Sequence, residues 1–207
     1  PMARLKEYNG HYCESEYEYA FIGFLEAEGW KYSSGNNISR VTKRDVLIAD
    51  DFKKFIADTN PDLTEDEVIQ IYDNVRLVGA ESNFATLHKV YGWMVNGVQF
   101  TTQDGLPRMI PLIDFDNWDK NIFRVVNQFT VEYTNNGQKE NRRPDVLLFV
   151  NGMPLCVIEL KNPADANATI YDAWEQINIR YWRDIPHLLH YCPLACISDG
   201  VKTRLGT

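Results

Sequence analysis

The sequence predicts an α/β fold in which a mixed sheet is flanked by helices. Helical periodicity over residues 15–28 precedes three strand-like runs between residues 123 and 161, and a helical run over 169–185 leads to a last strand at 194–200. The chain has 207 residues, 44% of them hydrophobic, which is enough for one domain with its own core. We therefore expect residues 1–207 to form a single domain.

The first helix is expected over residues 15–28. Ser15 and Glu18 have the spacing of a capping box, and Gly29 is a typical helix stop. Its apolar stripe consists of Tyr17, Phe21, Phe24 and Leu25.

Residues 40–80 are predicted to form a helical insertion. One helix is expected over 44–57, before the turn signal Asn60-Pro61. Another follows Thr64, whose spacing to Glu67 repeats the capping box.

After a further helix predicted over 83–97, the hydrophobic period changes from 3.6 to 2. Strands are expected at 123–133, 145–150, 154–161 and 194–200. The helix at 169–185 has an apolar stripe made of Ile170, Trp174, Ile177 and Tyr181.

The formal charge of -8 argues against a large nonspecific nucleic-acid surface, because phosphate binding needs clustered Lys and Arg. A local basic groove remains compatible with this charge. Several cationic residues fall in the last third of the chain: Arg142, Arg143, Lys161, Arg180 and Arg183.

The cysteines indicate reduced thiols in a cytoplasmic protein, since they lack the spacing of a secreted disulfide framework. They are Cys13, Cys156, Cys192 and Cys196. A zinc site of His187, His190, Cys192 and Cys196 is an alternative, disfavoured because Cys196 lies in a predicted strand. No apolar run approaches the roughly 20 residues of a membrane helix, so no membrane association is expected.

Charged residues interrupt an otherwise apolar predicted hairpin at 143–163. Because side chains alternate along a strand, Glu159 and Lys161 should share one face, with Ile158 and Leu160 on the other. Whether Asp145 joins them depends on the turn.

A two-residue Asn151-Gly152 loop would leave Asp145 and Glu159 on opposite faces, whereas an odd-length loop or a bulge would bring them together. We predict a three-residue loop over 150–152, with Asp145 opposite Val157 and diagonal to Glu159.

Two carboxylates about 5 Å apart repel by about 3 kcal/mol at an effective dielectric near 20, so a positive charge must offset them. Lys161 supplies one, and Mg²⁺ held by Asp145 and Glu159 would supply more while leaving room for a phosphate. On spacing alone, a structural ion pair between Lys161 and either carboxylate is the competing interpretation.

Pro144-Asp145 followed by Glu159-Leu160-Lys161 resembles the PD-(D/E)xK nuclease motif. The surrounding sequence resembles the N-terminal nuclease domain of the restriction (R, or HsdR) subunit of type I restriction-modification systems. It includes ESEYEYAFIGFLEAEGW, IDFDNWDKNIFRVVNQFTVEY, RRPDVLLFVNGMPLCVIELKNP and LACISDG. The similarity covers about residues 14–207 and is weakest between 35 and 80.

This resemblance implies a restriction-endonuclease-like core and a Mg²⁺-dependent endonuclease, with Mn²⁺ able to substitute, that cuts double-stranded DNA after ATP-driven translocation. By matching position, Asp145 and Glu159 would be metal ligands and Lys161 the catalytic lysine. Glu18 matches an acidic residue of the first helix that can touch the metal or its waters, although a purely capping role is an equal alternative.

The family also has a glutamine followed four residues later by a tyrosine, associated with DNA handling. Here Gln176 precedes Tyr181 by five residues, which in an α-helix separates the two side chains by about 140°. We therefore expect Gln176 to contact DNA or the active site and to share a face with Arg180, which is the better candidate for a phosphate contact. Tyr181 is the third DNA-binding candidate, although it also fits the apolar stripe.

In this family a motor that binds ATP follows the nuclease, and these 207 residues contain no GxxxxGK[ST] loop. The resemblance thus implies a piece of a longer subunit, with methyltransferase and specificity subunits as partners. Two alternatives are a nuclease-fold module that serves for docking or coupling, and a stand-alone repair or resolvase-type nuclease.

Overall fold

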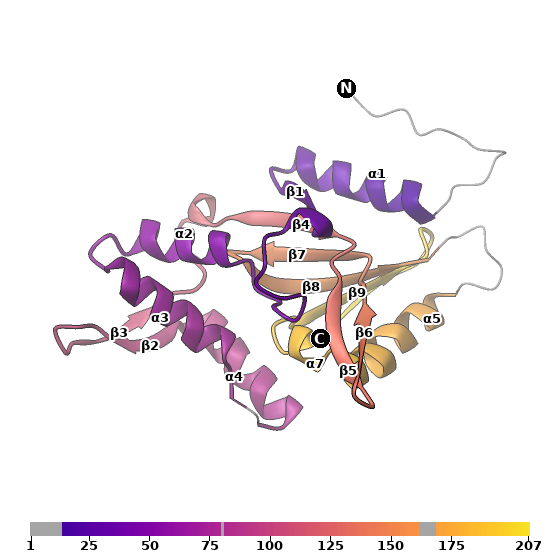
Figure 1. Ribbon diagram of the computed structural model, residues 1–207. Coiled ribbons are helices and arrows are strands. Elements are labelled where there is room, and N and C mark those ends of the chain that lie inside the picture. Colours follow the sequence, from indigo (N-terminus) through magenta and orange to yellow (C-terminus); the bar gives the residue numbers. More distant parts are fainter. Residues whose placement is uncertain (1–13, 80, 162–168) are drawn as a thin grey trace.

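A mixed six-stranded sheet forms the centre of the molecule, with strand order β1-β4-β7-β8-β9-β10 (Figure 1). The computed structural model describes residues 14–79, 81–161 and 169–207. The sheet strands are β1 (Lys31–Ser34), β4 (Phe123–Asn127), β7 (Val146–Val150), β8 (Met153–Leu160), β9 (Leu194–Ser198) and β10 (Thr203–Gly206). The β1–β4 and β8–β9 pairs are parallel and the other neighbours antiparallel, so the predicted mixed sheet is confirmed.

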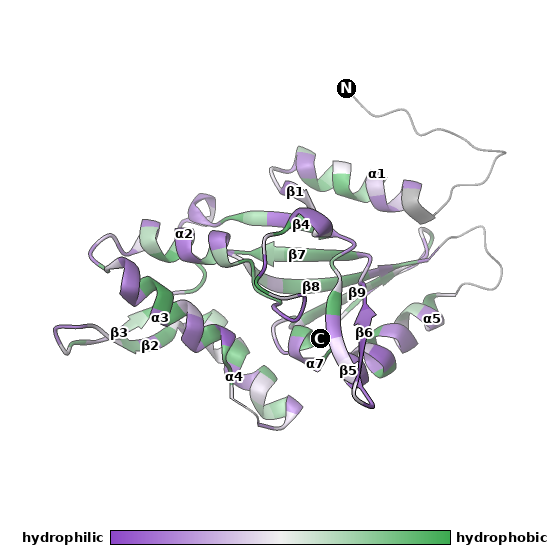
Figure 2. Ribbon diagram, viewed as in Figure 1, coloured by the Kyte–Doolittle hydropathy of each residue, from purple (hydrophilic) through white to green (hydrophobic). Residues whose placement is uncertain are grey.

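Helices cover both faces of this sheet because β7 and β8 are apolar on both sides (Figure 2). On one face, α1 (Glu14–Ala27) inserts Ile22, which packs in a cluster with Val146, Ile158 and Leu160. On the other face, Val157 joins the larger core with the helical residues that follow the sheet. The predicted alternation along β8 is therefore confirmed. The predicted stripe of α1 is wrong at Phe24, which is 64% exposed.

The predicted helical insertion contains α2 (Ala49–Thr59) and α3 (Glu65–Arg76), followed by α4 (Asn83–Asn96). The Thr64–Glu67 capping box is present, with hydrogen bonds of 2.8 Å and 3.3 Å between the backbone N–H of each and the side chain of the other.

Helix α2 begins at Ala49 rather than at 44, because the preceding segment packs in extended form against the β7–β8 turn. Ile48 N–H donates to Gly152 O at 2.8 Å, and Ile48 is itself buried. Gly152 permits this approach, since its φ is 77° and a Cβ there would lie 2.3 Å from Ile48 O.

Several elements escaped prediction, including β1, β10 and the hairpin of β2 (Val98–Thr101) and β3 (Pro107–Ile110). The strand expected at 123–133 is two strands, because Gln128 adopts a left-handed φ of 55° that ends β4. The chain then forms a separate two-stranded ribbon, β5 (Val131–Asn135) with β6 (Gln138–Arg142). Short 3₁₀ turns lie at η1 (Gly35–Asn37) and η2 (Trp118–Lys120).

The helix expected at 169–185 is present but not uniform. It consists of α5 (Ile170–Glu175), a π-helical segment η3 (Gln176–Tyr181) and α6 (Trp182–Asp184), with α7 (Pro186–Leu189) following. Ile177 and Tyr181 are buried as predicted, whereas Trp174 is 43% exposed and stacks on Tyr171 instead. In the part of the chain that is described, no helix has the length and apolarity needed to cross a bilayer.

Candidate active site

The register of the β7–β8 hairpin places Asp145 next to Glu159. The turn has two residues, Asn151 and Gly152, with φ values of 51° and 77°, so the predicted three-residue loop is wrong. Left-handed pairs of this kind match the twist of the flanking strands. A bulge restores the odd register, because Leu148 pairs with Cys156 whereas Phe149 pairs with Pro154, which leaves Leu155 as the extra residue.

Beyond this bulge the ladder ends at the pair Val146–Ile158, so Asp145 and Glu159, the next residues along the two segments, come to the same side of the sheet as neighbours. The predicted pairing of Asp145 with Val157 is wrong, but the predicted common face for the two carboxylates is confirmed. Asp145 is fixed further by Leu160 N–H, which donates to its Oδ2 at 2.8 Å.

Glu159 is wholly buried, at 0% exposure, with Asp145 as its charged neighbour. Burial, followed by the negative charge of Asp145, raises the pKa of Glu159 well above its ordinary value. Lys161 Nζ lies 4.0 Å from Glu159 Oε2 and donates a hydrogen bond of 3.3 Å to Gln176 Oε1. The three charged groups that interrupt the apolar hairpin, Asp145, Glu159 and Lys161, thus gather at one end of β7 and β8.

The π-helical segment brings two further polar side chains onto Glu159. Tyr181 donates its hydroxyl to Glu159 Oε1 at 2.6 Å, and Gln176 Nε2 donates to Oε2 at 2.6 Å. Gln176 Nε2 also lies 2.9 Å from the Tyr181 hydroxyl. In a π-helix the hydrogen bonds join residues five apart, so a five-residue spacing returns to the same face. The expectation that Gln176 shares a face with Arg180 rather than with Tyr181 is therefore wrong. Tyr181 is buried, as its place in the apolar stripe predicts, and its hydroxyl also reaches Glu159.

Glu18 reaches the same end of the sheet from α1. Its Oε1 accepts from Asn127 Nδ2 at 2.6 Å and its Oε2 from Gln128 Nε2 at 3.0 Å. Burial raises the pKa of Glu18, and Asp145 adds to this rise against the two hydrogen bonds. Ser15 lies inside α1, so the predicted capping box with Glu18 is wrong.

Asn127 and Gln128 are the residues of this site that sequence reasoning missed. Gln128 N–H donates to Asp145 O at 3.0 Å while its side chain holds Glu18, so one residue links the two acids. Two consecutive amides inside an apolar strand-like run were the available signal. Arg180 is exposed, and its DNA contact stays a prediction.

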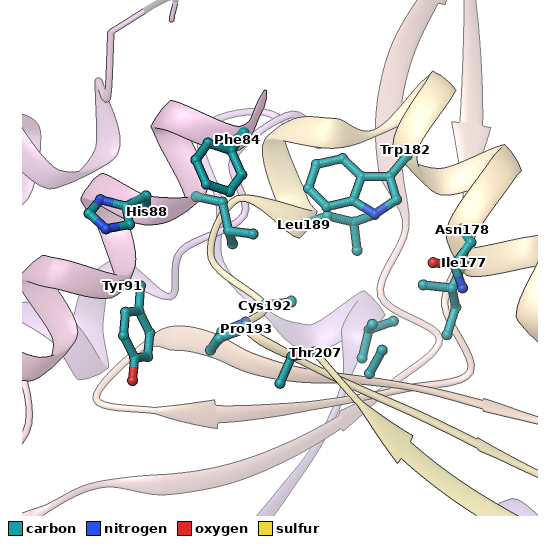
Figure 3. Close-up of a pocket in the computed structure, with 13 residues that line it drawn as sticks. Phe84, His88, Tyr91, Ile177, Asn178, Trp182, Leu189, Cys192, Pro193 and Thr207 are labelled. Atoms are coloured by element: carbon teal, nitrogen blue, oxygen red, sulfur yellow. The ribbon is translucent and has the colours of Figure 1, made fainter. Parts of the chain in front are cut away.

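A separate apolar pocket of about 420 Å³ lies between α4 and the helical segments η3 and α6. Figure 3 shows Phe84 and Tyr91 on one side of it and Trp182 on the other. Its lining includes Val157 but none of the charged groups described above, so it is not part of the carboxylate site.

The alternative zinc site gains no support from the described ranges, in which no three His, Cys, Asp or Glu residues gather as metal ligands. The same finding means that Asp145 and Glu159 form a pair without a third such residue among those described. Burial raises the pKa of Cys192 and of Cys196, which keeps both as thiols. Cys13 lies outside the described residues.

The chain is similar to proteins of type I restriction systems. A family described as "Type I restriction enzyme R protein N terminus" matches residues 12–207. A Methanocaldococcus jannaschii protein named "Putative type I restriction enzyme MjaIXP endonuclease subunit" is 34% identical over 200 residues, which is 92% of this chain and 19% of that protein. The Haemophilus influenzae "Type I restriction enzyme HindI endonuclease subunit" is 31% identical over 208 residues, or 94% of this chain and 19% of that protein.

The chain thus spans about a fifth of the length of these relatives. The match to the family model extends from residue 12 to the last residue and includes Asp145, Glu159 and Lys161. On this evidence, the chain belongs to the family of the N-terminal region of type I restriction enzyme R proteins.

Proposed function

We propose that this chain is a Mg²⁺-dependent nuclease domain of the PD-(D/E)xK type that hydrolyses phosphodiester bonds of double-stranded DNA. The observation that carries the proposal is the meeting of Asp145, Glu159 and Lys161 at one end of the sheet in a chain of this family. The ATP-driven motor, and with it ATP binding, would belong to the part of the subunit outside this chain. Methyltransferase and specificity subunits would be its partners, in the cytoplasm.

The donor set suits a hard divalent cation. Mg²⁺ binds through one or two carboxylates and keeps waters and phosphate oxygens as its other ligands. Each carboxylate has about four lone-pair sites, so the hydrogen bonds from Tyr181 and Gln176 leave Glu159 with acceptor capacity. Mn²⁺ accepts the same oxygen ligands. When bound, the ion would neutralise charge on the scissile phosphate and acidify a water.

The protein's own groups have distinct roles in this scheme. Asp145 and Glu159 would hold the ion, and Tyr181 and Gln176 would orient Glu159. Lys161, whose side chain is 14% exposed, would bind a phosphate oxygen or hold a proton of the attacking water. Gln176 accepts a hydrogen bond from Lys161 and donates one to Glu159, so this single amide would fix the distance between Lys161 and Glu159. Glu18 would contact the metal's waters on the Asp145 side.

The test is DNA cleavage by the full-length subunit carrying Glu159→Ala or Lys161→Ala. We expect both variants to lose cleavage while ATP hydrolysis and the circular dichroism spectrum stay close to wild type. Lys54→Ala, which removes one exposed charge on α2, is the matched control. Cleavage that survives in both site variants would reject the nuclease assignment. It would favour the docking or coupling module, in which the buried Glu159–Tyr181–Gln176 network has a structural role.

A further inference from the structure

A polar pocket of about 300 Å³ lies between the β5–β6 ribbon and the helical turns α6 and α7. It is separate from the carboxylate pair and from the apolar pocket. Its lining residues are Arg44, Tyr133, Thr134, Asn135, Arg183, Asp184, Pro186 and His187.

Arginine side chains outnumber carboxylates around this pocket, although the chain as a whole carries a charge of -8. Asp184 is bridged by two of them: Arg142 Nη2 lies 2.6 Å from its Oδ2 and Arg183 Nε lies 2.7 Å from its Oδ1. Arg44 has no ion-pair partner among the residues that the structure describes. The nearby Glu140 is already engaged, because it accepts hydrogen bonds from Tyr133 and Asn135.

His187 adds an unmet hydrogen-bonding group. Its Nε2 is buried and has no partner within the described part of the chain. A buried polar atom of this kind costs free energy until a ligand or water satisfies it. Burial, then the charge of Arg44, lowers the pKa of His187 to about 4, so the ring is neutral near pH 7. A neutral imidazole can donate one hydrogen bond without adding a charge that Arg44 would oppose.

The walls of the pocket are tied directly to the candidate active site. Arg142 lies three residues before Asp145, a stretch that spans at most about 10 Å. Asp184 lies three residues after Tyr181, a rise of about 4.5 Å along an α-helix. The Arg142–Asp184 ion pair joins these two segments, so the pocket is held at a fixed position beside the Glu159 site.

We infer that this pocket binds a phosphate group, and that the phosphate is one of the DNA backbone a few nucleotides from the bond that is cut. Arg44 and Arg183 would bind its oxygens, with His187 as a neutral donor. The inference rests on the proposed nuclease function for the identity of the ligand. A nucleotide such as ATP offers the same phosphate chemistry, so the test must separate the two sources.

The experiment measures binding of a fluorescein-labelled 20-base-pair duplex to the 207-residue chain by anisotropy, in EDTA so that no cleavage occurs. Arg44→Ala and Arg183→Ala should each weaken binding by about tenfold and lower the salt dependence by about one counterion. Lys54→Ala, which removes one exposed positive charge on α2, should bind within twofold of wild type. Arg183→Lys keeps the charge and should recover part of the lost affinity, which guards against misfolding as the cause.

ATP is the second probe, titrated by calorimetry. Duplex affinity and salt dependence equal to wild type in both arginine variants would overturn the inference. Loss of ATP binding with unchanged duplex binding would overturn it as well, because the phosphate would then come from a free nucleotide. The nuclease proposal is tested separately, by DNA cleavage with the full-length subunit carrying Glu159→Ala. A failure of the nuclease proposal therefore appears in cleavage, and a failure of the phosphate pocket appears in binding.

Discussion

Replacement of Glu159 by Gln should stabilise the metal-free domain at neutral and alkaline pH. The ionised form of Glu159 is disfavoured because the side chain is wholly buried beside Asp145. Gln removes the charge and keeps the shape, but its amide nitrogen cannot accept, so it can keep only one of the two hydrogen bonds that Tyr181 and Gln176 donate to Glu159. The variant therefore avoids the free-energy cost of burying a charge, but its hydrogen bonds are neutral and weaker.

The size of the effect follows from the pairing of the two acids. Opposite residues in an antiparallel ladder have Cβ atoms about 5 Å apart, and charges at that distance repel by about 3 kcal/mol at an effective dielectric near 20. This repulsion of about 3 kcal/mol is an upper limit, because Glu159 can take up a proton and lose its charge. We expect a gain of about 1–3 kcal/mol at pH 8, or about 2–10 °C in the melting temperature of a domain of this size.

The pH dependence of the stability difference tests whether the buried charge of Glu159 is its cause. The folded-state pKa of Glu159 lies above its ordinary value of 4.5, so the folded state retains a proton that the unfolded state loses. The stability that this proton contributes is complete below pH 4.5 and is lost as pH rises towards the folded-state pKa. The advantage of Gln should therefore grow between pH 5.5 and 8 in thermal melts. Glu28→Gln, at an exposed position after α1, is the control.

Mg²⁺ should narrow the stability difference between the two proteins. The wild type should gain about 1.4 kcal/mol when Mg²⁺ is at ten times its dissociation constant, and the Gln variant should gain less. A melting-temperature difference that stays constant from pH 5.5 to 8, or equal gains with Mg²⁺, would refute the electrostatic reasoning.

Further outcomes are expected at nearby positions. Tyr181→Phe removes a hydrogen bond that lowers the pKa of Glu159, so Mg²⁺ affinity should fall by about tenfold at pH 7 and by less at pH 8.5 in calorimetry. Gly152→Ala should lower the unfolding free energy by at least about 2 kcal/mol in urea, since its Cβ would meet Ile48 O at 2.3 Å; Gly137→Ala, at a similar φ of 78° but with open space, should cost less. Deletion of the exposed Ile179 should turn the π-helical segment into α-helix, with Gln176 and Tyr181 then four positions apart. Cleavage by the full-length subunit should survive this deletion. Loss of cleavage with the domain still folded would contradict the prediction.

The regular elements of this fold could be predicted because their signals are local. The helical periodicity of residues 169–185, the Thr64–Glu67 capping box and the alternation along β8 each depend on residues within a few positions of one another. The start of α2 could not be predicted, because Ile48 is kept extended by the carbonyl of Gly152, about a hundred positions away in the chain. The edge strands β1 and β10 are short and mostly polar, so their periodicity carries little information.

The candidate site depends on three irregularities, and regular structure would have dispersed its residues. Without the bulge at Leu155, Asp145 and Glu159 would lie on opposite faces of the sheet. Without the π-helical segment, Tyr181 would point away from Gln176, so they could not both reach Glu159.

The third irregularity is the left-handed Gln128, which ends β4 where its N–H can reach Asp145 and its amide can reach Glu18. Each irregularity weakens a local backbone pattern and persists only because the surroundings determine it. All three act at the same end of the sheet and on the same acidic side chains. A stability requirement alone would not concentrate them there, whereas a site that must hold two carboxylates against their own repulsion would.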